Sequence, residues 1–301
     1  MPIYQVILLA IVQGLAELLP VSSSAHVIVA EKLMGLDPSS PQMTLLLVMH
    51  HTGTMFAVIV YFWKTWKQAY FSSAERFNQF AVRVLWATAL TGVIGEAIKK
   101  LIEKTIFRNA PKAQIEDLFG RLDLIAPALA AAGILILIAG LYERRKLANF
   151  IPGRAIDRFL GLGTVTFGQS TWMGIVQGLA LPFRGFSRSG STISVGMLVG
   201  AAKERAERFS FAMAVVLTPA VVGLEALRLE KAHSAAVTAG TPMDLHGSVL
   251  ASLLGMVFSF LAGLVALRWL SSWLENGRWY LFGIYCLVAS GVVFYLHTRG
   301  F

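Results

Sequence analysis

The six residues Ile-Val-Gln-Gly-Leu-Ala occur twice in this chain, at 11–16 and again at 175–180. Each copy lies in an apolar segment, precedes a proline and a serine-rich turn, and is followed by a second apolar segment. This repeated order of elements predicts two related halves, although a chance match of common membrane residues is the alternative. The interrupted segments cover about 3–19 and 24–35 in the first half, and about 164–182 and 189–201 in the second.

The composition places both halves in a membrane. Of the 301 residues, 56% are hydrophobic and only 14% are charged, and the mean hydropathy is +0.65. Soluble domains carry about 25% charged residues, so these values exclude an ordinary soluble enzyme, a disordered chain, a collagen and a coiled coil. Six further stretches approach the length of about 20 apolar residues that crosses a bilayer. They lie at about 43–63, 80–98, 123–141, 208–228, 247–270 and 279–297.

The polar breaks within the two interrupted pairs are typical of re-entrant hairpins, because irregular backbone at membrane depth must be buried in protein or line a wet cavity. Each half then contains one hairpin and three spans. Since three is odd, the second half must enter the membrane upside down, as in proteins that build a central site from inverted repeats. The sequence therefore predicts an all-α polytopic membrane protein with inverted repeats at about 1–145 and 155–299.

The formal charge of +9 resides mostly in the connections between apolar stretches. Basic residues in such places set topology and face anionic lipid, so we expect no nucleic-acid partner. The positive-inside rule places the slightly more basic connections in the cytoplasm and both termini outside. The longest polar connection, 99–122, is expected to hold an interfacial helix. The basic connections lie near 64–79, 142–160, 202–208 and 271–278.

The first break carries a cluster of polar side chains. Gln13 and Glu17 are four residues apart and share one helix face, and a carboxylate in an apolar helix usually marks a functional interior. Hydroxyls and free N–H groups at the start of the next helix form an anion site, and His26 lies within reach of Ser23 for proton transfer. The alternatives are a structural carboxylate, serine helix caps and a packing histidine. The hydroxyls belong to Ser22, Ser23 and Ser24.

The second break carries Arg184 and Arg188, which need partners because arginine is costly within a membrane. Glu17 is one candidate partner, and a phosphate is a better one because a guanidinium offers planar bidentate donors. Arg188 and Thr192 are four residues apart and can face one ligand. The alternative is an internal salt bridge without a ligand. Further hydroxyls come from Ser187, Ser189 and Ser191.

If the repeat is real, the two breaks meet. One side then supplies a carboxylate, serines and a histidine, and the other supplies arginine and hydroxyls. These groups could form an anion cradle, a nucleophile or activated water, and a base, as cleavage of a phosphate ester or anhydride requires. Elsewhere, His50 and His51 are adjacent and point in different directions on a helix, so a capping or packing role is favoured for His51 over one in the cavity.

Both breaks resemble one known family. The element Gln13-xxx-Glu17 followed by Pro-Val-Ser-Ser-Ser-Ala-His, and the later Gly-Phe-Ser-Arg-Ser-Gly-Ser-Thr, are similar to the undecaprenyl-diphosphate phosphatase family, also called the bacitracin-resistance protein family. The likeness covers nearly the whole chain and includes His-Thr-Gly-Thr at 51–54, where the family has His-Leu-Gly-Thr. It implies an enzyme that hydrolyses undecaprenyl diphosphate to undecaprenyl phosphate and inorganic phosphate. This reaction recycles the lipid carrier for peptidoglycan synthesis and confers bacitracin resistance.

The resemblance also implies a location and residue roles. The enzyme would lie in the bacterial cell membrane, with its site on the extracytoplasmic side, and would use Mg²⁺ or Ca²⁺, for which Glu17 is the candidate ligand. We expect Glu17, Ser23, His26 and Arg188 to be catalytic. Ser23 would attack with His26 as base, or Glu17 would orient a water or a cation. The expected substrate-binding residues are Gln13, Ser22, Ser24, Arg184, Ser187, Ser189 and Thr192.

Several positions depart from the family pattern. Arg184 replaces the leading proline of the family's PGxSRSxxT motif, which adds a cation beside the site. Ser24 stands where threonine is common, and Ala25 where glycine is common. Gln13 occupies the first acidic position and removes a carboxylate, so the expected cation dependence is less secure.

A transporter or flippase of a phosphorylated polyprenyl lipid is the second hypothesis, because inverted repeats with broken helices are also a transporter architecture. A carrier would bind the same lipid without needing a nucleophile. A purely structural membrane protein fits two intramembrane arginines and a glutamate poorly. The expected partners are a polyprenyl diphosphate and membrane lipid, and the sequence is compatible with a homodimer.

Overall fold

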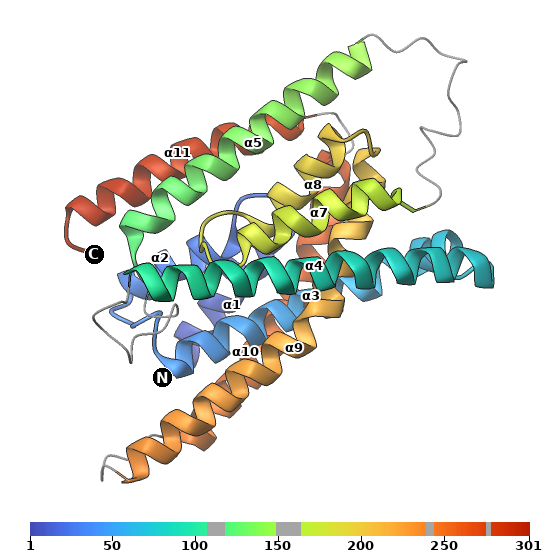
Figure 1. The fold of residues 1–301 in the computed structure, drawn as a ribbon. Helices are drawn as coiled ribbons and strands as arrows, with labels where there is room; N and C mark the ends of the chain where they lie inside the picture. Colours follow the sequence, from blue (N-terminus) through green and yellow to red (C-terminus); the bar gives the residue numbers. More distant parts are fainter. Residues whose placement is uncertain (107–117, 149–163, 239–243, 275–277) are drawn as a thin grey trace.

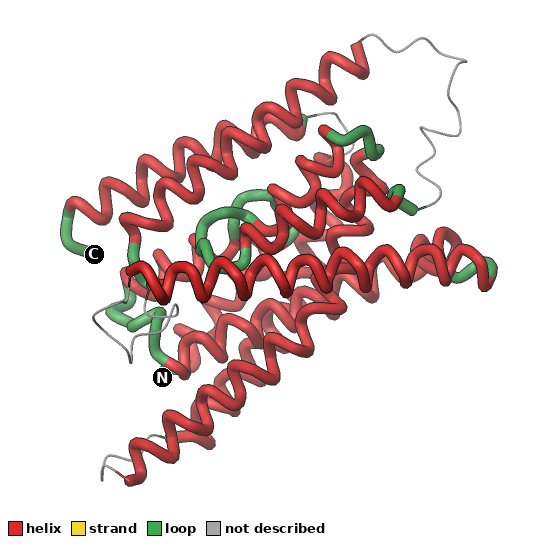
Figure 2. Tube along the Cα trace, in the orientation of Figure 1, coloured by secondary structure: helices red, strands yellow, loops and turns green. Residues whose placement is uncertain are grey.

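The computed structural model describes residues 1–106, 118–148, 164–238, 244–274 and 278–301, and helices are the only regular structure in these ranges. The helices and the short loops between them are drawn in Figures 1 and 2. They are α1 (Ile3–Glu17), α2 (Ser23–Leu33), α3 (Pro41–Tyr70), α4 (Ala74–Ile106), α5 (Leu122–Ala148), α7 (Phe167–Ala180), α8 (Arg188–Leu198), α9 (Lys203–Thr238), α10 (Leu245–Leu274) and α11 (Trp279–Thr298).

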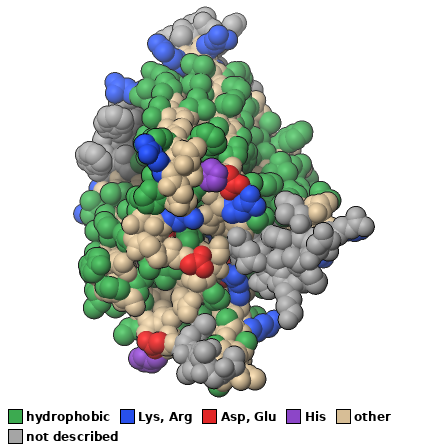
Figure 3. Space-filling model, turned by 90° about the vertical axis from the view of Figure 1, so that its left-hand side faces the viewer, with side chains coloured by type: hydrophobic (Ala, Val, Ile, Leu, Met, Phe, Trp, Pro, Cys, Tyr) green, Lys and Arg blue, Asp and Glu red, His purple; other side chains and the backbone are tan. Residues whose placement is uncertain are grey.

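Six of these helices, α3, α4, α5, α9, α10 and α11, are long and apolar enough to cross a membrane. This confirms the six predicted spans and an all-helical, multi-pass membrane protein. Their outward side chains are largely hydrophobic, as in the face drawn in Figure 3, where charged groups gather in a few places. Such a surface suits lipid rather than water.

Several helices are longer than the hydropathy pattern predicts. The expected connection at 99–122 is wrong at its beginning, because α4 continues to Ile106; residues 107–117 lie outside the described part. Ion pairs one turn apart support this polar end, with Lys100 Nζ 3.5 Å from Glu96 Oε1. Likewise α9 begins at Lys203 within an expected loop, and most of the predicted junction at 142–160 lies outside the described residues.

The short helices occupy the middle of the molecule. Helix α1 packs on α2 and α10, and α7 packs on α8 and α4. The pair α5 and α11 lies along one side of them, and α3 packs between α9 and α10 (Figure 1). The turn that joins α1 to α2 is therefore buried in the protein, whereas the turn that joins α7 to α8 is partly exposed at Phe183.

The two turns come into direct contact. Gly190 lies near the start of α8, and Pro20 lies in the connection between α1 and α2. A Cβ atom on Gly190 would lie only 3.0 Å from the Pro20 carbonyl oxygen. The Cys286 thiol of α11 reaches the same carbonyl at 3.6 Å. Gly185, in the second turn, has a φ of +100° and approaches the backbone of α5, a conformation that favours glycine. The glycines thus allow the two polar breaks to meet.

Candidate active site

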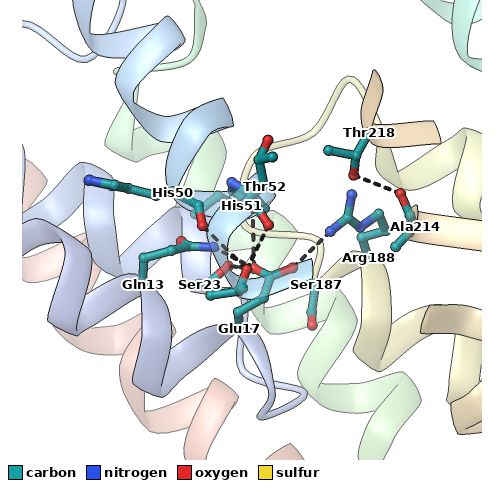
Figure 4. A network of polar contacts seen from close by, with 12 residues as sticks. Gln13, Glu17, Ser23, His50, His51, Thr52, Ser187, Arg188, Ala214 and Thr218 are labelled. Carbon is teal, nitrogen blue, oxygen red and sulfur yellow. Dashed lines mark hydrogen bonds and ion pairs between the residues drawn. The ribbon is translucent and has the colours of Figure 1, made fainter. Parts of the chain in front are cut away.

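Glu17 is the centre of a buried polar cluster (Figure 4). Its side chain is only 5% exposed. The carboxylate atom Oε1 accepts a hydrogen bond from Arg188 Nη2 at 2.8 Å. The other oxygen, Oε2, accepts from Gln13 Nε2 at 2.7 Å and from the Ser23 hydroxyl, and it lies 3.3 Å from His51 Nε2. One carboxylate therefore connects four side chains.

These side chains come from four helices. Gln13 and Glu17 form the last full turn of α1, Ser23 is the first residue of α2, and Arg188 is the first residue of α8. His51 projects from α3. Arg188 and Glu17 are 171 residues apart in the sequence. The meeting of the two breaks that the repeat predicts is therefore present in the fold.

The comparisons with known proteins agree with this arrangement. The family model described as bacitracin resistance protein BacA matches residues 6–292. The protein belongs to the BacA family. It is 55% identical to Undecaprenyl-diphosphatase 2 of Acinetobacter baylyi over 97% of both chains. It is also 33% identical to an Undecaprenyl-diphosphatase of Desulfatibacillum aliphaticivorans over 96% of both, and 32% identical to one of Renibacterium salmoninarum over 97% of this chain and 95% of the other.

In this BacA family member, His26 does not contact the Ser23 hydroxyl. Its Nδ1 lies 2.9 Å from the Ser22 carbonyl oxygen and its Nε2 lies 2.7 Å from the Tyr285 hydroxyl. A carbonyl can only accept, so Nδ1 carries the proton and a neutral His26 accepts from Tyr285. The group at the Ser23 hydroxyl is Glu17, and the geometry therefore does not supply His26 as the base for Ser23.

His51 is the residue of this site that the sequence argument missed, and the expected capping or packing role is wrong. Its neighbour His50 is fully buried, and neither ring nitrogen of His50 has a hydrogen-bond partner among the described residues. Adjacent histidines look alike in the sequence, although one faces α10 and the other faces Glu17. The signal that could have found His51 is its place in the His-Thr-Gly-Thr stretch that resembles the BacA family.

The remaining hydroxyls mostly shape the backbone. Ser22 has a left-handed φ of +65°, and its Oγ lies 3.5 Å from Ser24 Oγ. Ser187 caps α8 by accepting from Gly190 N at 3.1 Å. Thr192 Oγ1 donates to the Arg188 carbonyl at 2.7 Å, so it holds the backbone of that arginine. Ser189 is half-buried in the first turn of α8.

Arg184, which replaces the family's proline, is held beside the cluster. Its guanidinium lies over the Phe119 ring, 4.1 Å from the ring centre, an arrangement typical of a cation–π contact. It is also within electrostatic reach of Glu31, which is buried on α2. Arg184 therefore adds positive charge near the turn, and it is also within electrostatic reach of His51.

Proposed function

We propose that this protein hydrolyses undecaprenyl diphosphate to undecaprenyl phosphate and inorganic phosphate. This recycles the lipid carrier for cell-wall synthesis and confers bacitracin resistance. Family membership over nearly the whole chain supports this reaction. The observation that carries the chemistry is the contact of Ser23 and Arg188 with one buried carboxylate, because a nucleophile, a base and a cation meet there. A carrier would not need the hydrogen bond between Ser23 and Glu17.

Arg188 binds the substrate in this mechanism. A guanidinium has five N–H donors, so it can hold phosphoryl oxygens while one donor remains on Glu17. The free backbone N–H groups at the starts of α2 and α8 face the same anion. Together they position the terminal phosphorus beside the Ser23 hydroxyl and neutralise charge that builds up in the transition state.

Ser23 is the nucleophile. Its oxygen attacks the terminal phosphorus, its proton passes to Glu17, and the bond to the bridging oxygen breaks, so that undecaprenyl phosphate leaves with that oxygen. A water molecule then attacks the phosphoserine, Glu17 returns its proton to the departing Ser23 oxygen and takes one from the water, and inorganic phosphate is released with the serine restored. Glu17 acts as the base because it already accepts the Ser23 hydrogen bond.

The test is phosphate release from purified undecaprenyl diphosphate by the wild type, Ser23→Ala and Arg188→Ala. Both variants should lose at least about 100-fold in turnover, because each removes a group that acts on the reacting phosphoryl. Ser234→Ala and Arg145→Ala replace exposed residues far from the site and should retain turnover. Near-normal turnover in both site variants would contradict the proposed phosphatase function. Quantitative recovery of intact lipid from the wild type would favour a carrier.

The lipid chain of the substrate occupies an apolar groove of about 470 Å³ between α1, α2 and α11. Its walls include Leu15, Leu19 and Leu281, and His26 and Tyr285 form part of its lining. The groove is adjacent to the site because Ala16 and Val21 line it next to Glu17 and Ser22. Leu281→Trp should raise KM for undecaprenyl diphosphate more than KM for a short farnesyl diphosphate. Equal changes for both substrates would contradict this placement.

The membrane arrangement proposed is an inverted repeat with two re-entrant hairpins, in the bacterial cell membrane, with the site open to the extracytoplasmic side. In this repeat α1 corresponds to α7, α3 to α9, and α4 to α10. The packing supports the repeat, because the contacts of α10 with α1 and α3 are matched by contacts of α4 with α7 and α9. All groups named in the mechanism come from one chain, so a homodimer is not required and stays a prediction.

Single cysteines test this orientation. Cys286 is buried and is the one cysteine of the chain, so Cys286→Ser gives a protein without cysteine. In it, Phe301→Cys should react with a membrane-impermeant thiol reagent added to intact cells, whereas Ser72→Cys, in the short loop before α4, should not. The opposite pattern would reverse the topology.

A further inference from the structure

The donor set around Glu17 does not fit a divalent cation held by the protein. Mg²⁺ and Ca²⁺ take six or more oxygen ligands, which in proteins are chiefly carboxylates and carbonyls. Glu17 is the one carboxylate in the cluster, and the described residues contain no group of three His, Cys, Asp or Glu side chains that could hold a metal. The position expected to supply a second carboxylate is Gln13.

The two oxygens of Glu17 are already used. A carboxylate offers about four acceptor sites. Oε2 accepts from Gln13 and Ser23 and has the His51 ring against it, and Oε1 accepts from Arg188. The amide nitrogen of Gln13 faces Glu17, so its oxygen is turned away. A cation at Oε2 would have to displace these groups, and a cation at Oε1 would lie beside the positive charge of Arg188.

His51 is held against Glu17 by a contact with the backbone of its own helix. His51 Nδ1 lies 2.8 Å from the Leu47 carbonyl oxygen, which can only accept, so Nδ1 carries a hydrogen. The other ring nitrogen, Nε2, faces Glu17 Oε2 at 3.3 Å. The imidazole ring therefore lies against one side of the carboxylate, and on the other side the Arg188 guanidinium supplies positive charge at the place where a metal would supply it.

We propose that this enzyme binds no divalent cation of its own at Glu17, and that the Arg188 guanidinium takes the place of the metal, while Gln13, Ser23 and His51 fill the space around the carboxylate. Turnover then does not depend on Mg²⁺ or Ca²⁺. The corollary is that metal use depends on two positions, 13 and 51. A second carboxylate at 13 and a neutral amide at 51 would create an oxygen site for the cation beside Glu17.

Two measurements test this, and only one of them rests on the proposed function. The first is equilibrium dialysis of the detergent-purified protein against ⁴⁵Ca²⁺. It measures bound ion directly and does not depend on enzyme activity. The wild type should show no bound ion that Glu17→Gln removes, whereas the double variant Gln13→Glu, His51→Gln should gain about one. The control is Gln79→Glu, which places a carboxylate one turn from Glu75 on the exposed face of α4, where Gln79 now donates to Glu75 at 3.1 Å. It should gain no comparable site.

The second measurement is phosphate release with and without a chelator. Wild-type turnover should change by less than about two-fold, and turnover of the double variant should fall by at least about ten-fold, the size of effect typical for loss of a metal site. A Glu17-dependent ion in the wild type, or a ten-fold loss of wild-type turnover with chelator, would overturn the proposal. If no sample released phosphate, the proposed function would fail while the dialysis result would still decide the cation question.

Discussion

The two hairpins share a motif and a position but carry opposite chemistry. Ser22 and Ser187 precede the second helix of each hairpin, and the first residue of that helix is Ser23 in one and Arg188 in the other. Gln13 and Gln177 occupy the same place in the repeated motif, and both are fully buried. Gln13 donates to Glu17, whereas the polar atoms of Gln177 have no partner among the described residues, and Leu181 stands where the motif would place a glutamate.

This difference shows how a repeated scaffold can build an asymmetric site. Gly190 of the second hairpin lies against the Pro20 carbonyl of the first, and this close approach brings the two helix starts together. In the proposed mechanism the residues that differ divide the work: the first hairpin provides the nucleophile and its base, and the second provides the arginine that binds the anion. Substitutions at matching positions should therefore have very different effects.

The largest effect is expected for Glu17→Gln. It removes the base for Ser23 and leaves the Arg188 guanidinium without its carboxylate, so turnover should fall by about 10²–10⁴. Leu181→Gln, at the matching position of the other hairpin, should cost far less. Phosphate release by the two purified variants checks this. Comparable losses would show that the hairpins do not divide the chemistry as described.

The second-largest effect is expected for a substitution at the contact between the two turns. In Gly190→Val, the new Cβ would lie 2.7 Å from Ser187 Oγ and 3.0 Å from the Pro20 oxygen. We expect a loss of about 1–3 kcal/mol in stability and a lower turnover, because the two helix starts would separate. Thermal unfolding in detergent measures the first effect. Gly291→Ala is the control, since nothing lies within 4 Å of its Cβ, and it should be neutral or slightly stabilising.

The two glutamines sharpen the comparison further. Gln13→Leu removes a hydrogen bond to a charged group, worth about 1.5–3 kcal/mol, and should lower turnover by about ten-fold or more. Gln177→Leu removes a buried polar group that has no hydrogen-bond partner in the described part of the chain, and it should leave turnover within about two-fold of the wild type. Steady-state assays decide between them. If Gln177→Leu were the more damaging change, the second hairpin would have a polar role that its contacts do not show.

The smallest effect should come from His26→Gln. Glutamine can still bond the Ser22 carbonyl and the Tyr285 hydroxyl, and Glu17 remains the acceptor for Ser23. Turnover should stay within about five-fold of the wild type, whereas loss of a general base would cost about 10²–10⁴. A loss of that size would restore His26 as the base.

The sequence predicted the six spans, the four short helices and the charged groups that would meet, because hydropathy and costly intramembrane charges are visible residue by residue. It could not orient the His26 ring. The spacing between Ser23 and His26 describes positions on one helix only, whereas the ring contacts Tyr285, which lies 259 residues away in the sequence. It could not separate His51 from His50, because the direction of each depends on the packing of α3 against α1 and α10. It also missed the length of α4, where polar ion pairs extend the helix beyond its apolar part.

The central claim is that the first hairpin supplies the nucleophile for a phosphate held by the second. The most direct test mixes the enzyme with undecaprenyl diphosphate labelled with ³²P in its terminal phosphate, quenches with acid within one turnover, and maps the label on the protein. The account predicts labelled Ser23 in the wild type and no label in Ser23→Ala, which should also release phosphate far more slowly. Normal turnover by Ser23→Ala would contradict it.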